Sequence, residues 1–92
     1  MKYYSWDPEK NERLKRERGI SFEVATWWIE NGGLMDLIEH PNKERYSSQM
    51  IYVVNIDGYV HWVPFVESDT QVFLKTIITS RKEKQKYLGG KK

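Results

Sequence analysis

The stretch QMIYVVNI-DG-YVHWVPFVE, residues 49–67, decides the fold of this 92-residue chain. Two runs rich in β-branched and aromatic residues flank Asp57-Gly58, and Asp-Gly between such runs predicts a two-residue type I′ turn. The pattern therefore predicts a β-hairpin made of Gln49–Ile56 and Tyr59–Glu67. Because Pro64 cannot donate a ladder hydrogen bond, we expect a bulge or an early strand end there.

Alternation of side chains sorts this hairpin into two faces if Ile56 pairs with Tyr59. The first face then carries Met50, Tyr52, Val54, Tyr59, His61, Val63 and Phe65. The second face carries Ile51, Val53, Val60, Trp62 and Val66. A turn at residues 68–70 leads into a predicted last strand, Gln71–Thr79, which adds Phe73, Lys75 and Ile77 to the first face. His61 and Lys75 are therefore expected to share one surface, with Tyr52 and Tyr59 nearby.

Two helices are predicted before the hairpin. Asp7-Pro8 is typical of a helix start and Gly19 of a helix end, so the first helix covers Pro8–Arg18. Leu14 is its only aliphatic residue, which predicts that this helix buries little surface unless a partner covers it. Ser21 predicts the cap of a second helix, Phe22–Glu30, which Asn31-Gly32-Gly33 stops.

The remaining segments complete an α+β chain. Residues 3–6 are expected to be extended, Leu34–Glu39 is a possible strand, and the capping box of Ser80 and Glu83 predicts a final helix over Arg81–Leu88. The expected fold has two N-terminal helices, an antiparallel sheet of three to four strands and a short C-terminal helix. It is one domain, residues 1–88, followed by a flexible basic tail, residues 89–92.

Composition excludes several classes of protein. The chain has no cysteine, so it has no disulfide scaffold, thiol nucleophile or thiolate zinc site. With His40 and His61 as its only histidines, we expect neither a metal nor a cofactor. No apolar run approaches the roughly 20 residues that span a bilayer, and the first residues lack the apolar stretch of a signal peptide, so we expect neither a membrane span nor a signal peptide. We expect a cytoplasmic protein with no membrane partner.

Charge is distributed unevenly along the chain. Residues 1–18 carry a net charge of +2, residues 19–74 a net charge of −6, and residues 75–92 a net charge of +6. Such asymmetry indicates a basic end that meets phosphate or an acidic partner. A solvated helix face with a disordered lysine-rich tail would give the same pattern.

The predicted surface of His, Lys, Arg and Tyr suits RNA cleavage without a metal ion. His61 can move a proton near neutral pH, while Lys75 and Arg81 can hold the anionic phosphate. Tyrosines can stack on a base. The same pattern also fits a partly buried, hydrogen-bonded structural histidine at position 61.

Several blocks of the sequence resemble the BrnT toxins. Trp6-Asp7-Pro8-Glu9-Lys10, then Gly19-Ile20-Ser21-Phe22-Glu23 and Ala25, is similar to their W-D-x-x-K and K-H-G-[IV]-S-F-E-E-A motifs. Glu44-Arg45-Tyr46 resembles their E-R-[FY] segment, and Ile77–Lys82 with Tyr87 resembles their closing strand and helix start. The chain departs from the family pattern at Leu14, where Asn is frequent, and at Glu17-Arg18, where Lys-His is usual.

The resemblance implies a RelE/ParE-like ribonuclease toxin of a type II toxin–antitoxin pair. Its partners would be RNA and a BrnA-like ribbon-helix-helix antitoxin, with operator DNA contacted only through that antitoxin. We expect His61, Lys75 and Arg81 to be catalytic and Arg45, Tyr59, Lys82 and Tyr87 to bind RNA. The antitoxin is expected to cover part of the basic C-terminal surface.

Two alternatives remain open from the sequence. The first is a non-catalytic protein of the same fold that inhibits a protein target or serves only as antitoxin partner and co-repressor. The second is a small basic nucleic-acid-binding module unrelated to toxins.

Overall fold

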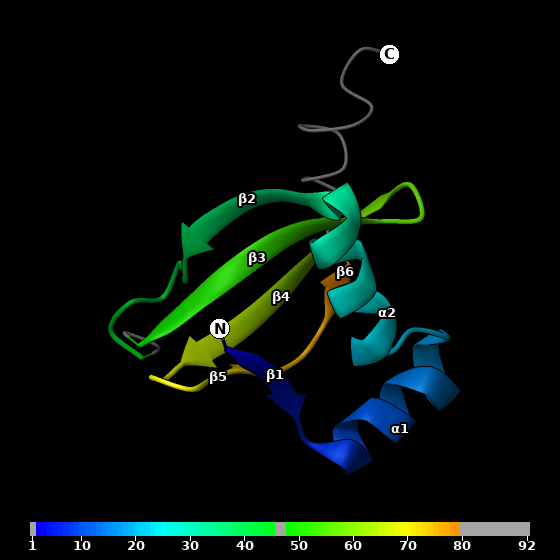
Figure 1. The fold of residues 1–92 in the computed structure, drawn as a ribbon, viewed down its shortest axis with the longest axis horizontal. Helices are drawn as coiled ribbons and strands as arrows, with labels where there is room; N and C mark the ends of the chain where they lie inside the picture. The colour runs from blue at the N-terminus through cyan, green and yellow to red at the C-terminus, as the bar shows by residue number, and fades with distance from the viewer. Residues whose placement is uncertain (1, 46–47, 80–92) are drawn as a thin grey trace.

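The computed structural model describes residues 2–45 and 48–79, which form two helices packed on a twisted sheet (Figure 1). The predicted helix Arg81–Leu88 and the predicted tail 89–92 lie outside the described residues. The elements follow in the order β1 (Tyr3–Trp6), α1 (Pro8–Arg18), α2 (Phe22–Trp28), the π-helical turn η1 (Ile29–Gly33), β2 (Leu34–Glu39), β3 (Gln49–Ile56), β4 (Tyr59–Glu67), β5 (Gln71–Leu74) and β6 (Ile78–Thr79).

The sheet is mixed, whereas the sequence predicted an antiparallel one. Its strand order is β1-β5-β4-β3-β2. β6 pairs with the same edge of β4 as β5 does, nearer the start of β4. β1 runs parallel to β5, with Tyr3 opposite Gln71, and the other pairs are antiparallel. The extended segment at residues 3–6 was expected, but its place in the sheet was not, because four residues carry no signal for a partner so distant in the sequence.

The central hairpin confirms the sequence prediction. Ile56 lies opposite Tyr59, and the pairing continues without a shift to Gln49 opposite Val66. Asp57 and Gly58 have φ angles of 55° and 88°, so both turn residues adopt the positive φ that a type I′ turn requires. The two predicted faces of the hairpin are therefore correct.

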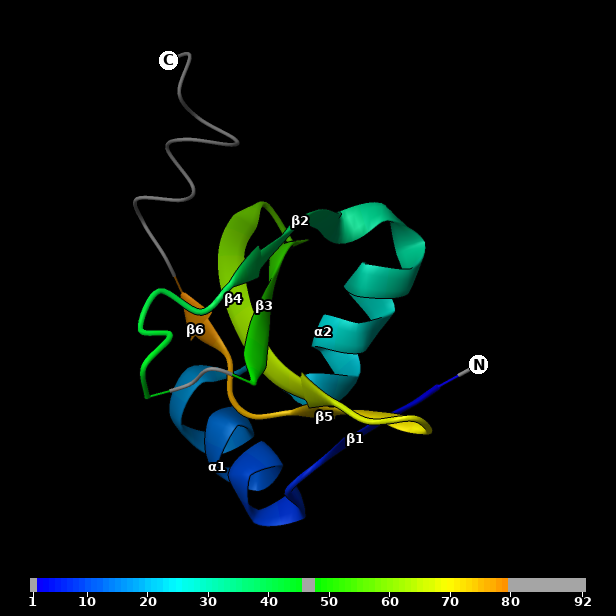
Figure 2. The same ribbon diagram turned by 90° about the vertical axis from the view of Figure 1, so that its left-hand side faces the viewer.

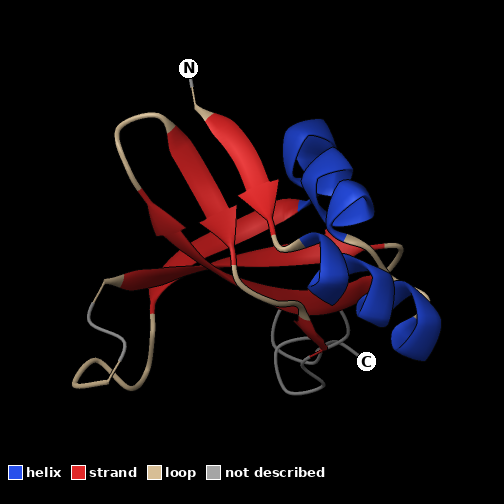
Figure 3. Cartoon of the chain, turned by 90° about the horizontal axis from the view of Figure 1, so that it is seen from below, coloured by secondary structure: helices blue, strands red, loops and turns tan. Residues whose placement is uncertain are grey.

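Both helices pack against the first face of the hairpin (Figures 2 and 3). Leu14 of α1 and Phe22 and Ala25 of α2 join the core, and the Trp6 ring stacks on Phe22 with ring centroids 5.5 Å apart. The strands supply the rest of this core, namely Val54, Ile56, Val63, Phe65, Val72, Leu74 and Ile77. Ile51, Val53 and Val60 of the second face are buried as well.

A buried amide joins the two helices. The Asn11 Nδ2 group donates to Glu23 Oε1 at 2.8 Å, and Asn11 Oδ1 accepts from the Phe22 backbone N–H at 2.8 Å. Asn11 is 3 % exposed, so α1 buries a polar group in addition to Leu14. This contact explains how a helix with one aliphatic side chain is held against the fold.

The predicted last strand, Gln71–Thr79, is interrupted. Phe65 pairs with Leu74 and Trp62 with Ile78, so residues 63–64 of β4 lie opposite the three residues 75–77. The bulge or early strand end expected at Pro64 is therefore not found in β4, which continues through Pro64, and the extra residue lies in the neighbouring segment instead. The Pro64 carbonyl accepts from the Lys75 backbone N–H at 2.8 Å, which keeps the bulged segment attached to β4.

The register corrects the predicted position of Lys75. Phe73 lies opposite Val66, on the second face of the sheet, and the Lys75 ammonium group lies 5.4 Å from the centre of the Phe73 ring. Lys75 therefore does not share the surface of His61. The prediction was wrong because it placed the strand after the 68–70 turn one residue out of register.

Candidate functional site

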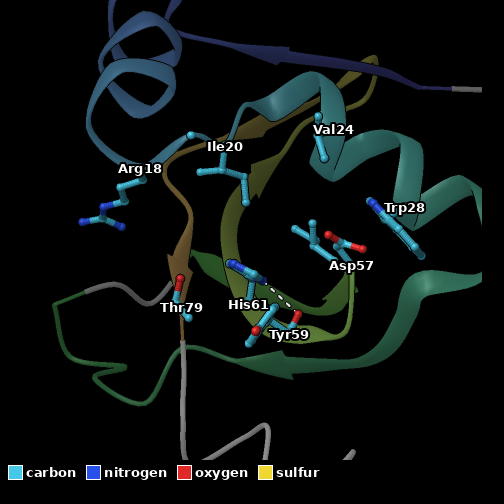
Figure 4. A pocket seen from close by; sticks show the side chains of 10 residues that line it. Arg18, Ile20, Val24, Trp28, Asp57, Tyr59, His61 and Thr79 are labelled. Atoms are coloured by element: carbon cyan, nitrogen blue, oxygen red, sulfur yellow. Dashed lines mark hydrogen bonds between the residues drawn. The ribbon is translucent and has the colours of Figure 1, made fainter.

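A pocket of about 440 Å³ opens beside His61 (Figure 4). It lies where the junction between α1 and α2, the turn between β3 and β4, and the end of β6 come together. The side chains that define its chemistry are those of Arg18, Trp28, Asp57, Tyr59, His61 and Thr79, while Gly19, Ile20, Val24 and Ile56 complete the wall. The volume falls in the range of small-ligand sites, about 300–1,000 Å³.

His61 lies in the pocket with a defined tautomer. It stands on β4 opposite Val54 on one side and Thr79 on the other, and it is 7 % exposed. Its Nδ1 lies 2.9 Å from the Tyr59 carbonyl oxygen, and since a carbonyl only accepts, Nδ1 carries the proton. Nε2 is thus left as an acceptor, with no partner among the residues that the structure describes.

Burial lowers the pKa of His61 below its usual value, and the hydrogen bond to the Tyr59 carbonyl opposes this shift only in part. The imidazole is therefore neutral at neutral pH. A neutral imidazole with a free Nε2 is the form that a general base requires.

Arg18 lines the pocket at the end of α1. One guanidinium nitrogen, Nη1, donates to the Ile77 carbonyl oxygen at 2.8 Å, which fixes the side chain beside the bulged segment. The other N–H donors of the fork have no partner among the described residues and suit an anion such as phosphate. Figure 4 shows Arg18 and Thr79 toward one end of the pocket, with the Arg18 guanidinium directed away from His61.

Trp28 and Asp57 lie at the opposite end of the pocket (Figure 4). Trp28 ends α2 and meets Trp27 edge to face, with ring centroids 5.3 Å apart. Asp57 stands at the first position of the hairpin turn, and its carboxylate has no hydrogen-bond or ion-pair partner among the described residues. The pocket therefore has a cationic end and an anionic end, with His61 and Tyr59 between them.

The structure brings together only some of the residues that the sequence selected. His61 and Tyr59 line the pocket, whereas Lys75 lies on the other face of the sheet. Arg45 is in the loop between β2 and β3, where its backbone N–H donates to Asn42 Oδ1 at 3.2 Å, and it does not line the pocket. Arg81, Lys82 and Tyr87 lie outside the described residues.

Sequence reasoning missed Arg18, Trp28 and Asp57. A signal for Arg18 was present, because Glu17-Arg18 stands where the resembled family usually has Lys-His. Asp57 was assigned only to the turn, and Trp28 only to the apolar face of α2. Their approach to His61 depends on how α2 lies over the hairpin, which no local pattern determines.

A second polar cluster joins β1 to η1. The Tyr4 hydroxyl donates to Glu30 Oε2 at 2.7 Å, and burial together with this carboxylate raises the pKa of Tyr4 well above its usual value. Burial also raises the pKa of Tyr52, which stacks on Phe65 at 4.1 Å between ring centroids. Both phenols stay protonated at neutral pH.

Within residues 2–45 and 48–79, no group of three or more His, Cys, Asp or Glu side chains is placed to hold a metal ion. In the same residues, no helix is both long and apolar enough to cross a membrane. Comparison of the chain with family models, with curated proteins and with solved structures finds no match.

Proposed function

We propose that this chain is a ribonuclease that cleaves RNA at the His61 pocket without a metal ion, and that it acts in the cytoplasm as the toxin of a type II toxin–antitoxin pair. The observation that carries the proposal is a neutral, oriented His61 whose Nε2 has no partner among the described residues, in a pocket whose wall includes Arg18. The resemblance of the sequence to BrnT toxins, with their RelE/ParE-like fold, supports the biological role.

The chemistry follows from these groups. His61 Nε2 takes the proton of a ribose 2′-hydroxyl, and the 2′-oxygen forms a bond to the adjacent phosphorus. The bond from phosphorus to the 5′-oxygen breaks, and that oxygen takes a proton from water at the pocket mouth. Arg18 stabilises the extra negative charge that the phosphorane carries. The products are a 2′,3′-cyclic phosphate and a 5′-hydroxyl.

The proposed partners follow from the toxin role. A ribbon-helix-helix antitoxin would neutralise the chain and carry any contact with operator DNA. Arg81, Lys82, Tyr87 and Arg45 remain proposed contacts for RNA or for this antitoxin. The basic end of the sequence supports such a role, because phosphate and acidic segments both favour clustered Lys and Arg.

The test is cleavage of a single-stranded RNA by the purified chain, together with growth of a bacterium in which the chain is induced. Wild type should cleave RNA and arrest growth, and His61→Ala should lower the rate by about 10²–10⁴-fold, as loss of a general base does. His40→Ala, which removes the other histidine in the loop after β2, is the matched control and should behave as wild type.

Circular dichroism of each variant separates loss of activity from loss of fold. Growth arrest with intact RNA would refute the nuclease and favour the non-catalytic binder of a protein target. That second candidate has one observation in its favour, since a histidine only 7 % exposed also suits a purely structural role.

A further inference from the structure

Asp57 is a charged side chain in the pocket that the cleavage chemistry does not use. Its carboxylate has no hydrogen-bond or ion-pair partner among the described residues, although it faces a pocket lined with hydrogen-bonding groups. A turn needs a residue that tolerates positive φ at this position, and Asp, Asn and Gly all satisfy that need. The turn alone therefore does not explain why a carboxylate is present.

The two ends of the pocket impose a direction on any nucleotide that enters it. A phosphate is attracted by Arg18 at one end and repelled by Asp57 at the other. The base of the same nucleotide must then point toward Asp57 and Trp28 (Figure 4). This direction places the ribose in the middle of the pocket, where His61 lies.

The end of the pocket that receives the base offers an aromatic ring and two acceptor oxygens. Trp28 supplies a stacking surface, which any base can use. A carboxylate accepts two hydrogen bonds side by side, and guanine is the RNA base whose pairing edge presents two adjacent donors, N1–H and N2–H. Adenine and cytosine present one amino group on that edge, and uracil presents one N–H between two carbonyl groups that a carboxylate repels.

We propose that the pocket selects guanine, with Asp57 accepting from N1–H and N2–H, Trp28 supporting the base and Arg18 holding the 3′-phosphate. Asp57 is then the specificity-determining residue, and the nucleotide on the 5′ side of the cleaved bond is a guanosine. This inference rests on the proposed function, because it identifies the base at the same pocket where His61 would act.

Binding can be measured without cleavage by titrating the full chain with guanosine 3′-monophosphate. The chain has four tryptophans, so four indole N–H signals are expected in a ¹H–¹⁵N spectrum, and Trp28→Phe assigns the one that reports on the pocket. Guanosine 3′-monophosphate should shift the Trp28 signal and bind about tenfold more tightly than the adenosine, cytidine and uridine equivalents, as one bidentate base contact allows.

Asp57→Asn is the decisive variant, because asparagine tolerates the same positive φ and keeps the turn. It should weaken guanosine 3′-monophosphate binding by about tenfold, since one acceptor and the charge are lost. Asp69→Asn, in the exposed turn between β4 and β5, is the matched control and should leave binding unchanged. Equal affinity for the four nucleotides, or an Asp57→Asn variant that binds guanosine 3′-monophosphate as wild type does, would overturn the inference.

The outcomes for this inference and for the proposed function can be told apart. RNA cleavage that depends on His61 but shows no preference for guanosine overturns the role of Asp57 and leaves the nuclease intact. Selective guanosine 3′-monophosphate binding that Asp57→Asn weakens, in a chain that cleaves no RNA, supports the guanine site and overturns the nuclease.

Discussion

The stability of the fold should be most sensitive to substitution of Asn11, whose buried amide joins the two helices. Asn11→Ala removes the acceptor of the Phe22 backbone N–H and the donor to the Glu23 carboxylate. Phe22 is fully buried, so its N–H would lose its side-chain acceptor where water does not replace it. We therefore expect α1 to be held much less firmly on α2 in this variant.

The magnitude follows from the two hydrogen bonds. A buried donor left without an acceptor costs about 1–3 kcal/mol. The bond to Glu23 contributes about 0.5–1 kcal/mol, because that carboxylate is exposed and water screens it. The free energy of unfolding should fall by about 1.5–4 kcal/mol, a large part of the 5–15 kcal/mol that a domain has. The corresponding fall in melting temperature is about 6–30 °C.

Urea denaturation followed by tryptophan fluorescence measures this loss, since the Trp6 ring stacks on Phe22 and reports on the same region. Asn11→Asp separates the two bonds, because its carboxylate can still accept from the Phe22 N–H but repels Glu23. Its loss of stability should be smaller at acid pH, where a carboxyl is protonated. The Asn11 hydrogen bond also lowers the pKa of Glu23, so that pKa should return toward its usual value in Asn11→Ala.

Arg13→Ala, at an exposed position of the same helix, is the control and should change stability by less than about 0.5 kcal/mol. An Asn11→Ala variant as stable as Arg13→Ala would show that the amide does not hold the helices together. The description of α1 as a helix held on α2 by the Asn11 amide would then be wrong.

Three further predictions concern the site and the fold. Folding lowers the pKa of His61 from about 6.5, so the neutral imidazole stabilises the fold above that pH. This contribution to the free energy of unfolding is lost as the pH falls through the folded pKa. Urea denaturation near pH 7.5 and near pH 5 should therefore show that wild type loses more stability between these two pH values than His61→Gln does. Equal losses would contradict the burial described. Lys75→Ala should cleave RNA at the wild-type rate, whereas the cleavage rate of Arg18→Ala should fall by at least about tenfold. The opposite result in a cleavage assay would restore Lys75 as the residue that holds the phosphate. Gly33→Ala should lower the free energy of unfolding by about 1–3 kcal/mol, because a Cβ at this position would lie 2.7 Å from the Asn55 carbonyl oxygen. Thermal melts measure this loss, and a variant with the wild-type melting temperature would show that the turn after α2 can adjust to the methyl group.

Local signals predicted most of the secondary structure. Asp7, Ser21 and Gly19 mark helix boundaries through their own side chains or backbone angles, and the structure confirms each of them. The Asp57-Gly58 turn set the register of the hairpin, because a two-residue turn allows one pairing only. α2 ends at Trp28, two residues before the predicted helix end at Glu30, and η1 begins at Ile29.

Non-local features could not be predicted in the same way. The parallel pairing of β1 with β5 joins residues nearly 70 positions apart, such as Tyr3 and Gln71. Of the candidate site, His61 and Tyr59 were found because residue type alone suggests their chemistry. Arg18 and Asp57 were not, since each already had a local explanation, one as the end of a helix and the other as a turn residue.

The three-residue bulge at 75–77 has a consequence for chain length. Leu74 and Ile77 both face the core and Thr79 lies opposite His61, while residues 75–77 span two residues of β4. Removing one residue from this segment would leave two residues opposite Val63 and Pro64, so plain alternation would keep Ile77 on the core face and Thr79 opposite His61. Deletion of Lys75 or Thr76 should therefore keep β6 paired with β4, because the segment holds one residue more than a regular strand needs to span the same distance.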